Sequence, residues 1–460
     1  MEIEVAKKLI KDYVPGHGAF LQQALEAERY YNSQDDILYL PKRDQQEEET
    51  NPLRSADNRI SIGFYPLLVD QKASYMFTAP PLFDVHDDAM NKLIVQTLGD
   101  EYKRKTMDLC VNASNSGIAW LHYWEDEAHK FNYEVVPSTQ IIPIWSPKLS
   151  HDLLGVLRVY SDLDDNGDMW DVYEIWNETE CATFRKRAAD TIDVGLIPWP
   201  AFTDFYLQGF SESENQYRHP FGRVPFIPFW NNSRGTNDLQ PVKKLIDAYD
   251  KTYSGYMNDL EDIQEVIFVL TNYGGADLKE FLKDLKFYKT ISVDSAGGDD
   301  KSGVSTLTID IPVEAREKML DRTAQAIFKI GQGVDPDQQG LDKTSGEAMK
   351  FLYALLELKA GKMQVSFESG FNTLIRAILK HAEHEGVADI VQTWTRTSIK
   401  NDSDLAQMCS QSSGIVSRKT ILAHHPFVEN ADDELKQIQK EQEEQDAETD
   451  PYNDDEGGEE

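Results

Sequence analysis

Cysteine is scarce in this sequence, with only three in 460 residues. Cys110, Cys181 and Cys409 are far apart and odd in number, so they indicate neither a disulfide framework nor a zinc site. Such sparse use of cysteine is typical of proteins from a reducing compartment, for which the cytoplasm is the natural candidate.

Long hydrophobic runs are also missing. A membrane-spanning helix needs about 18 or more consecutive apolar residues, whereas the longest obvious run here is Val266–Leu270. The N-terminal residues MEIEVAKKLIKDY contain no uninterrupted apolar core and do not resemble a secretory signal. We therefore expect no membrane partner.

The common catalytic motifs do not occur. The stretch GGDDKSG lacks the spacing of a phosphate-binding Walker A loop. There is no Gly-x-Ser-x-Gly elbow and no His-Glu-x-x-His helix. Carboxylates are so abundant that their number does not indicate a catalytic pair. We predict that the chain is not an enzyme and has no catalytic residues and no cofactor.

Two patterns imitate metal sites without completing them. Asp162–Asp168 matches the first half of a calcium-binding EF-hand loop, but Tyr173 stands where the loop needs a glutamate. A hairpin turn is the favoured interpretation, and a weak calcium site is the alternative. His381 and His384 share one face at the end of a predicted helix, but no third ligand accompanies them. We predict a solvated helix end and no metal.

Basic residues are far outnumbered, since 46 lysines and arginines face 80 acidic residues for a net charge of −34. Proteins that grip DNA usually show a basic footprint, so this balance disfavours a site-specific DNA binder. It is compatible with a conduit through which a duplex must slide. Residues 441–460 hold 11 acidic and no basic side chains, and we expect order to fade from about Glu441.

A long amphipathic helix is predicted after Asp238, which suits an N-cap, and Pro241, which suits a first turn. Its apolar residues recur at helical spacing as far as Ile267, and Gly274 and Gly275 supply a stop. Four residues of this stripe, Tyr249, Tyr253, Tyr256 and Met257, lie on a helix too long to be covered by a small domain of its own. We expect them to pack partly against neighbouring subunits.

Two strands, a second helix and a third follow. The strands are predicted at Phe287–Val293 and Val304–Ile309, and the second helix runs from Pro312 to Gly331. A polar loop comes next, in which we expect no residue to anchor a core. Thr344 and Glu347 form a capping box for a helix that continues to about His384, with bends plausible at the glycines 361 and 370.

The first half of the chain is mixed. Helical segments are predicted at Val5–Leu9, Ala19–Tyr30, Ile60–Tyr75 and Met90–Asn112. Alternating segments then predict strands at Trp120–Trp124, Phe131–Val136, Gly155–Tyr160, Trp170–Trp176 and Cys181–Lys186. The fold class is therefore α+β.

Several blocks follow one another along the chain: ERYYNSQDDIL, NRISIGFYPLLVDQKASYMF, YEVVPSTQIIPIW, PFGRVPFIPFWNN with LQPVKKLIDAYDKTYSGYMNDLEDIQE, and KIGQGVDPDQQGLDKTSGEAMKFLYALLELKA. Together, and in this order, they resemble the portal proteins (head–tail connectors) of tailed double-stranded-DNA bacteriophages. The resemblance covers nearly the whole chain and implies the portal fold, with long stem helices, a β-containing clip, an α/β wing and a helical crown. It divides the chain into a wing (1–237), a stem helix (238–273), a clip (274–310), a second stem helix (311–331), a tunnel loop (332–345), a long wing helix and strand (346–400), a crown (401–440) and an acidic disordered tail (441–460).

The resemblance also implies a role and partners. Twelve copies would form a ring at one capsid vertex, through which double-stranded DNA passes during packaging and ejection without sequence specificity. The ring would dock the terminase, the head-completion adaptor, and the scaffold and major capsid proteins. Two other classes stay open: a non-portal adaptor or scaffold protein, and a soluble hydrolase with an unrecognised carboxylate site.

Two further groups of residues are candidate sites. Lys279, Lys283, Lys286 and Lys289 give the entry to the strand insert an unusual basic density. They predict either a solvated helix face or a docking surface for an acidic partner. The tunnel loop would form the constriction of the channel, with glycines for flexibility and few apolar residues. Its polar and charged members are Gln332, Asp335, Asp337, Gln338, Gln339, Asp342 and Lys343.

Overall fold

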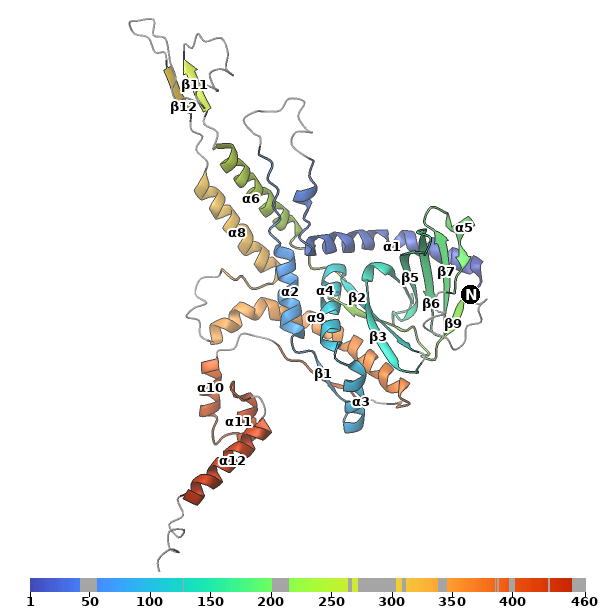
Figure 1. Ribbon diagram of the computed structural model, residues 1–460, viewed down its shortest axis with the longest axis vertical. Coiled ribbons are helices and arrows are strands. Elements are labelled where there is room, and N and C mark those ends of the chain that lie inside the picture. The colour runs from blue at the N-terminus through green and yellow to red at the C-terminus, as the bar shows by residue number, and fades with distance from the viewer. Residues whose placement is uncertain are drawn as a thin grey trace, which may run out of the picture.

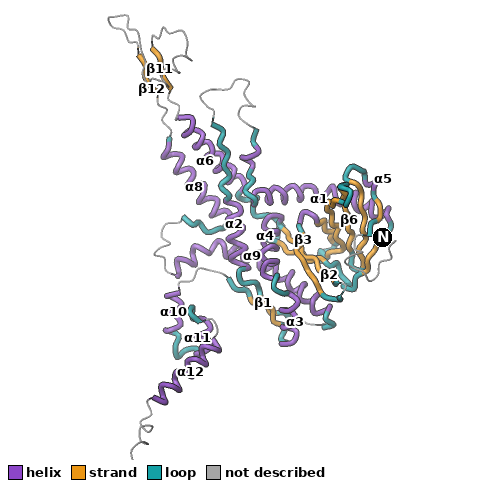
Figure 2. Tube along the Cα trace, viewed as in Figure 1, coloured by secondary structure: helices purple, strands orange, loops and turns teal. Residues whose placement is uncertain are grey.

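The computed structural model is elongated, with a two-helix projection at one end, a broad body in the middle and a small helical part at the other end (Figure 1). It describes residues 1–448 except 42–55, 127, 201–214, 264–266, 272–302, 308–311, 338–345, 385, 387–388, 397–401 and 429–430. Helices dominate the projection and the opposite end, and most strands gather in the body (Figure 2).

The projection consists of α6 (Lys243–Ile263) and α8 (Val313–Gly331), which lie side by side. We call these two helices the stem. They are joined across their surfaces by an ion pair between Arg316 and Asp259. The guanidinium carbon of Arg316 also lies 5.5 Å from the ring centre of Tyr256. The second stem helix was predicted from Pro312 to Gly331, and its observed bounds, Val313–Gly331, match that prediction closely.

The first stem helix is shorter than predicted. It ends at Ile263, and Ile267–Thr271 instead forms strand β11, which pairs antiparallel with β12 (Gly303–Leu307). The prediction of helix through Ile267 was wrong, because the run from Ile267 is continuously apolar and rich in β-branched residues, which suits a paired strand better than one helical stripe. β12 confirms most of the strand predicted at Val304–Ile309. The other predicted strand, Phe287–Val293, lies outside the described residues.

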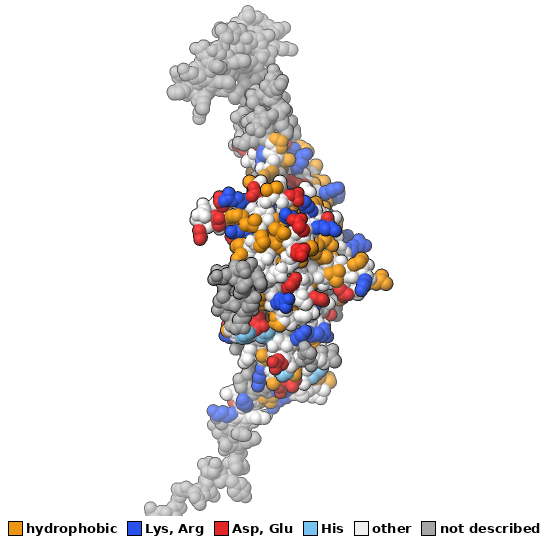
Figure 3. Space-filling view, turned by 90° about the vertical axis from the view of Figure 1, so that its right-hand side faces the viewer, with side chains coloured by type: hydrophobic (Ala, Val, Ile, Leu, Met, Phe, Trp, Pro, Cys, Tyr) orange, Lys and Arg blue, Asp and Glu red, His pale blue; other side chains and the backbone are white. Residues whose placement is uncertain are grey.

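Among the described residues, the body contains two antiparallel sheets of three or more strands. The smaller has the order β10-β2-β3 and the larger the order β4-β5-β6-β7-β8, with β9 paired to β7. Their strands are β2 (Ile118–Glu125), β3 (Phe131–Val136), β4 (Ile141–Trp145), β5 (Leu153–Leu163), β6 (Met169–Trp176), β7 (Glu180–Arg187), β8 (Ile197–Pro198), β9 (Gln216–Arg218) and β10 (Phe226–Trp230). All five strands predicted for the first half of the chain are confirmed. On the face seen in Figure 3, acidic side chains are dispersed among basic ones, and hydrophobic side chains gather near the middle.

The Asp162–Asp168 segment forms the hairpin turn between β5 and β6, as favoured from the sequence. Leu163 pairs with Met169 across the turn. The Asp164 carboxylate closes it by accepting hydrogen bonds from the backbone N–H of Asn166 (3.0 Å) and Asp168 (2.9 Å) and from the indole N–H of Trp170 (2.9 Å). This carboxylate therefore caps its own loop.

Helices surround these sheets. The long α1 (Ile3–Tyr31) joins two segments predicted separately and contains Pro15. The other helices of the first half are α2 (Phe64–Phe77), α3 (Asp88–Leu98), α4 (Tyr102–Ser116), the single turn α5 (Ile192–Gly195) and the 3-10 turns η1 (Asp36–Tyr39) and η3 (Ser138–Gln140). A short ladder of β1 (Leu82–Asp84) with β13 (Val391–Thr393) ties this half to the C-terminal half.

The body also contains α9 (Gly346–His381), a continuous helix of 36 residues. Its aromatic residues Phe367 and Phe371 are fully buried against Phe229 of β10, with ring centres 5.0 and 5.1 Å away. Gly370 faces the same ring so closely that a Cβ atom there would lie 2.6 Å from Phe229. A glycine at this position thus lets the helix lie directly on the sheet.

The described residues of the C-terminal part form the helices α10 (Asp402–Gln411), α11 (Arg418–His424) and α12 (Ala431–Glu448). The expectation that order fades from about Glu441 was wrong for the first eight residues of the tail, since α12 continues through Glu448. Glutamate and glutamine are good helix formers, and Gln437 donates a hydrogen bond to Glu441 one turn on. The rest of the tail lies outside the described residues.

Candidate functional site at the base of the stem

The stem, α2 and α9 meet at a buried ionic cluster around Asp238, which precedes α6. The carboxylate of Asp238 binds the ammonium group of Lys72 from α2 and lies 3.1 Å from that of Lys359 in α9. The side-chain amide of Asn231 donates a third interaction at 2.8 Å. Lys72 is only 1% exposed. One carboxylate therefore holds two ammonium groups that come from different helices.

These charges stabilise each other. Burial alone would raise the pKa of Asp238, but Lys359 and Lys72 hold that pKa well below its usual range. Burial lowers the pKa of Lys359, although Asp238 opposes the change. Breaking one side of a buried ion cluster strands the remaining charge at a cost of about 3–5 kcal/mol. The cluster thus locks the start of the stem to the body.

The C-terminal end of α8 is held by a residue of the same ionic cluster, Lys359. Lys359 also donates a hydrogen bond to the carbonyl oxygen of Gly331, the last residue of α8, at 2.9 Å. Gln332 then adopts a left-handed conformation with φ of 57°, and the N–H of Gly333 returns to the carbonyl of Phe328 at 2.9 Å. A Cβ on Gly333 would lie 2.3 Å from Leu68. The chain therefore leaves α8 in a defined direction.

The loop after α8 is anchored at its beginning. Val334 packs against the main hydrophobic core, and its N–H donates to the side-chain oxygen of Gln71 at 2.9 Å. The amide nitrogen of Gln71 donates in turn to the Val334 carbonyl oxygen at 2.7 Å. The expectation that no residue of this loop could anchor a core was wrong, because Val334 combines an apolar side chain with a backbone that pairs with a distant glutamine.

The predicted channel residues are only partly brought together. Gln332 and Asp335 are half-buried and Asp337 is exposed. The carboxylate of Asp335 accepts a hydrogen bond from the backbone N–H of Asp337 at 3.0 Å. The remaining four, Gln338, Gln339, Asp342 and Lys343, lie outside the described residues, as do Lys279, Lys283, Lys286 and Lys289.

The tyrosines of α6 differ in how closely they pack against other residues of their own chain. Tyr249 packs edge-on against Phe64 of α2, with ring centres 4.8 Å apart, and stacks on Tyr253 at 6.2 Å. Tyr253 and Tyr256 are half-buried, and Met257 is 37% exposed. Tyr249 therefore serves the packing of its own chain, while Met257 leaves apolar surface open.

An extended segment, residues 56–62, lies along α6 and pairs with it by a regular set of hydrogen bonds. We call it the strap. Alternate backbone N–H groups of the strap donate to side chains that recur every fourth residue of the helix. The pairs are Ala56 with Asp262 (2.9 Å), Asn58 with Asn258 (2.6 Å), Ile60 with Ser254 (3.0 Å) and Ile62 with Asp250 (3.3 Å).

The match between strap and helix is geometric. Two residues of extended chain advance about 6.6 Å and four residues of helix about 6.0 Å, so the two repeats stay in step over this short length. The sequence carries a signal for this stripe, because Asp250, Ser254, Asn258 and Asp262 are all hydrogen-bond acceptors at i, i+4 spacing. Sequence reasoning missed it by following only the apolar stripe.

The strap ends beside a pair of buried carboxyl groups. Asp35 and Asp250 are 1% and 0% exposed, and among the described residues one carboxyl oxygen of each has no hydrogen-bond partner, an arrangement that a proton shared between the two groups would satisfy. Burial first, and then the adjacent Asp35, raise the pKa of Asp250 to about 8. The hydroxyl of Ser61 donates to Asp35 at 2.8 Å. This pair belongs to the joint between stem and body.

The described residues contain no cluster of three or more His, Cys, Asp or Glu side chains that could hold a metal ion. Within the same residues, no helix is long and apolar enough to cross a membrane. The arrangement at the stem base thus consists of ion pairs and hydrogen bonds that position helices.

Comparison with known proteins decides the family. Residues 10–448 match the family model "Phage portal protein, SPP1 Gp6-like". The chain belongs to the phage portal protein family. It is 38% identical over 443 residues to a portal protein of Clostridium phage phiCD119, with 94% of each chain covered. It is 30% identical over 459 residues to the portal protein of Bacillus phage SPP1, covering 95% of this chain and 85% of that one.

Solved structures include a more remote match. The neck of a native gene transfer agent particle, computed with C12 symmetry, aligns with a TM-score of 0.44 and 11% identity over 79% of this chain and 89% of that one. This likeness is too distant to carry an argument. The family model and the two relatives confirm the resemblance drawn from the sequence, the α+β portal fold, and a function as a structural portal protein of phage particles.

Proposed function

We propose that the chain assembles into a ring, of twelve copies as the family resemblance implies, at one vertex of the phage head. Double-stranded DNA would enter and leave through the channel of this ring. The observation that carries the proposal is the portal family match over residues 10–448. It is supported by a stem that projects from the body and by apolar side chains on it, such as Met257 and Leu260, that are 37% and 40% exposed.

Exposed apolar side chains on a projecting stem need a partner surface, and a cyclic ring supplies one because each copy uses two different faces. The variant Met257→Asp should disrupt assembly, while Leu163→Asp, at an exposed hairpin end away from the stem, should not. Native mass and negative-stain images of both variants test this. A wild-type chain that stays at 52.4 kDa and shows no ring would contradict the proposal.

The loop 332–345 would surround the channel axis as a constriction. Its start is fixed by Gln71 and Val334, so all copies would present the following residues at one level. Gln338, Gln339 and Lys343 would touch phosphates weakly, while Asp335, Asp337 and Asp342 would prevent strong capture. Cysteines at Gln338 or Gln339, cross-linked between subunits, should stall packaging in rings that still form. Normal filling of heads by such rings would contradict this role.

The clip at the tip of the stem would dock the terminase and later the head-completion adaptor, and the wing and crown would face capsid and scaffold proteins. The lysines 279, 283, 286 and 289 would steer an acidic partner, with an attraction that weakens in salt. Reversing two of these charges should impair motor-driven packaging and leave rings intact. Packaging at the wild-type rate would remove the docking role. No catalytic step is assigned to the chain in this proposal.

A further inference from the structure

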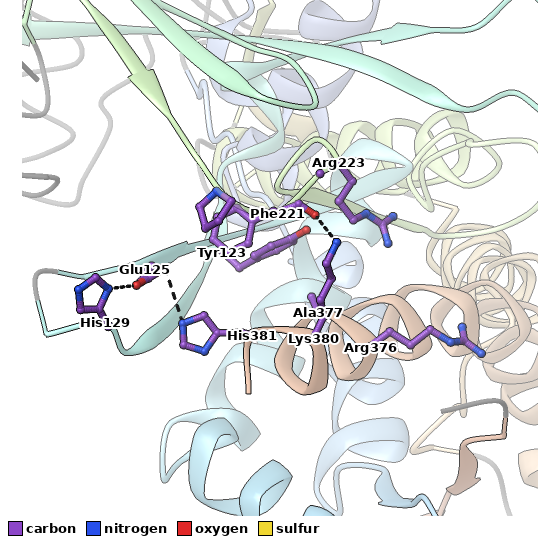
Figure 4. Close-up of a pocket in the computed structure, with 11 residues that line it drawn as sticks. Tyr123, Glu125, His129, Phe221, Arg223, Arg376, Ala377, Lys380 and His381 are labelled. Carbon is purple, nitrogen blue, oxygen red and sulfur yellow. Dashed lines mark hydrogen bonds and ion pairs between the residues drawn. The ribbon is translucent and has the colours of Figure 1, made fainter. Parts of the chain in front are cut away.

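A cavity of about 500 Å³ opens where the last turns of α9 face the end of β2 and the loop before β10. Figure 4 shows the residues that line it, with Glu125 and His129 on the left. Three cationic side chains line it: Arg223 from the loop, and Arg376 and Lys380 from α9. In a chain with a net charge of −34, a concave site lined by three cations is unusual.

The three cations have no carboxylate partner in the part of the chain that the structure describes. Arg223, Arg376 and Lys380 take part in no ion pair among the described residues. Lys380 uses one of its three N–H groups, on the carbonyl oxygen of Phe221 at 3.2 Å. Among the described residues, the one carboxylate that lines the cavity is Glu125, which is paired with two histidines, His129 and His381, the latter at 3.8 Å. Glu125 lies on the opposite side of the cavity from the two arginines (Figure 4).

A buried hydroxyl group adds a second, independent feature. Tyr123 is 0% exposed and lines the cavity, yet its hydroxyl has no hydrogen-bond partner among the residues that the structure describes. In Figure 4 this hydroxyl points toward the side where Lys380 and Arg223 lie. Burial raises the pKa of Tyr123 to about 12, so the group remains a hydrogen-bond donor at neutral pH. A buried donor without an acceptor costs free energy, and an anion held by Lys380 and Arg223 would supply the acceptor.

The position of the cavity along α9 distinguishes between two possible anions, the phosphates of DNA in the channel and the carboxylates of a protein outside the ring. Residues 346 and 376 are 30 positions apart on this helix, which is about 45 Å at ~1.5 Å per residue. If the loop before α9 lines the channel, as proposed above, this cavity lies far outward from the axis and out of reach of DNA in the channel. Proteins around the ring can reach it. Carboxylates suit arginine well, because the guanidinium fork binds them through two parallel hydrogen bonds.

We propose that this cavity is a docking site for an acidic peptide segment of a protein that surrounds the ring. One carboxylate of the segment would bind Arg223 and Lys380 and accept the hydrogen bond of Tyr123, and a second would bind Arg376, whose side chain extends away from the other two cations (Figure 4). The choice of a protein partner rests on the proposed channel function, whereas the anion-binding property of the cavity rests on the named side chains alone.

The test uses the full chain and a fluorescein-labelled hexaglutamate peptide, with binding followed by fluorescence anisotropy at low salt. Arg376→Gln should weaken binding by about fivefold, and the double variant Arg223→Gln, Arg376→Gln by more than about tenfold. Tyr123→Phe should also weaken binding while leaving the Tm unchanged or higher, because the hydroxyl has no partner in the empty cavity. Lys362→Gln is the matched control, since it removes an exposed cation from the same helix outside the cavity.

Several results would overturn the proposal. One is equal binding of the peptide by all four variants, and another is no binding by the wild type. A third is a labelled 20-base-pair DNA duplex, rather than the peptide, responding to the cavity variants, since that would assign the cavity to nucleic acid. Rings counted in negative stain give a separate readout. Rings without cavity-dependent peptide binding contradict this inference, and cavity-dependent binding without rings contradicts the proposed function.

Discussion

Gln71 holds the backbone of Val334 from both sides, accepting from its N–H at 2.9 Å and donating to its carbonyl oxygen at 2.7 Å. The two residues are 263 positions apart in the sequence and belong to α2 and to the loop after α8. The side-chain amide of Gln71 thus pairs with the backbone of Val334 as the backbone of a residue in a neighbouring strand would. It fixes the point from which the loop departs toward the channel that we propose.

Removing this clamp should loosen the loop without disturbing the fold. Gln71→Ala leaves a donor and an acceptor of Val334 without partners, which costs about 1–3 kcal/mol if they stay buried. Hydrogen exchange at Val334 should accelerate by at least about fivefold, while exchange in α9 stays unchanged. Gln364→Ala is a suitable control, because Gln364 on α9 does not contact the loop in the described residues and bonds to Glu368 instead. Unchanged exchange at Val334 would show that packing alone holds this residue.

Two glycines in the interior of α9, Gly361 and Gly370, should respond oppositely to substitution by alanine. A Cβ at Gly370 would lie 2.6 Å from the ring of Phe229, whereas nothing lies within 4 Å of one at Gly361. Gly370→Ala should therefore destabilise the chain by about 1–3 kcal/mol through overpacking. Gly361→Ala should stabilise it by up to about 1 kcal/mol, because alanine is the better helix former. Thermal unfolding of both variants checks the pair, and equal shifts of the Tm would refute the packing argument.

The buried cluster at Asp238 should be far more sensitive than an exposed ion pair. Asp238→Asn leaves Lys72 and Lys359 without a counter-charge, at a cost of about 3–5 kcal/mol. Because the pKa of Asp238 is lowered by folding, its contribution is present above the ordinary aspartate range and is lost as the pH falls. The control Asp193→Asn removes an exposed partner of Lys11 and should hardly change the Tm. Urea unfolding at pH 7 compares them, and similar midpoints would contradict the role of the cluster.

Local patterns in the sequence were enough to predict much of the secondary structure of the fold. The second stem helix, α9 and the five predicted strands follow from periodicity and from Pro and Gly signals at their ends. The end of α6 was misplaced because Val266–Leu270 fits both a helical stripe and a strand, and only its pairing with Gly303–Leu307 decides between them. β10 was not predicted, because its partner β2 lies about 100 residues earlier and its short run Phe226–Trp230 contains a proline.

The candidate site was less accessible from the sequence, since its contacts join distant segments. Lys359 and Asp238, or Gln71 and Val334, carry no shared local pattern that would indicate a pair. The strap is an intermediate case. The i, i+4 acceptors of α6 are visible in the sequence, but the extended residues 56–62 that bind them cannot be identified without the fold.

The carboxyl pair at the end of the strap predicts an unusual dependence of stability on pH. Unfolding frees Asp250 to titrate near its ordinary value of 3.8, while the folded chain keeps its pKa at about 8. Between these values the folded state binds one more proton than the unfolded state at this site, so this contribution to stability falls as the pH rises from about 4 to about 8 and then levels off. Asp250→Asn mimics the protonated acid, since its oxygen can still accept from Ile62 and its amide can donate to Asp35.

The Asp250→Asn variant should therefore lose this pH dependence. It should be more stable than the wild type at high pH, where the contribution of the Asp250 proton to stability has been lost. At pH 8 its Tm should exceed that of the wild type by about 2–4 °C or more, the shift that ~1 kcal/mol produces in a domain of 150–250 residues. At pH 5 the difference should be smaller. Asp321→Asn, an exposed acid on α8, should show no such trend and controls for the loss of one negative charge. If Asp250→Asn lowered the Tm equally at both pH values, the two carboxyl groups would not share a proton in the folded chain.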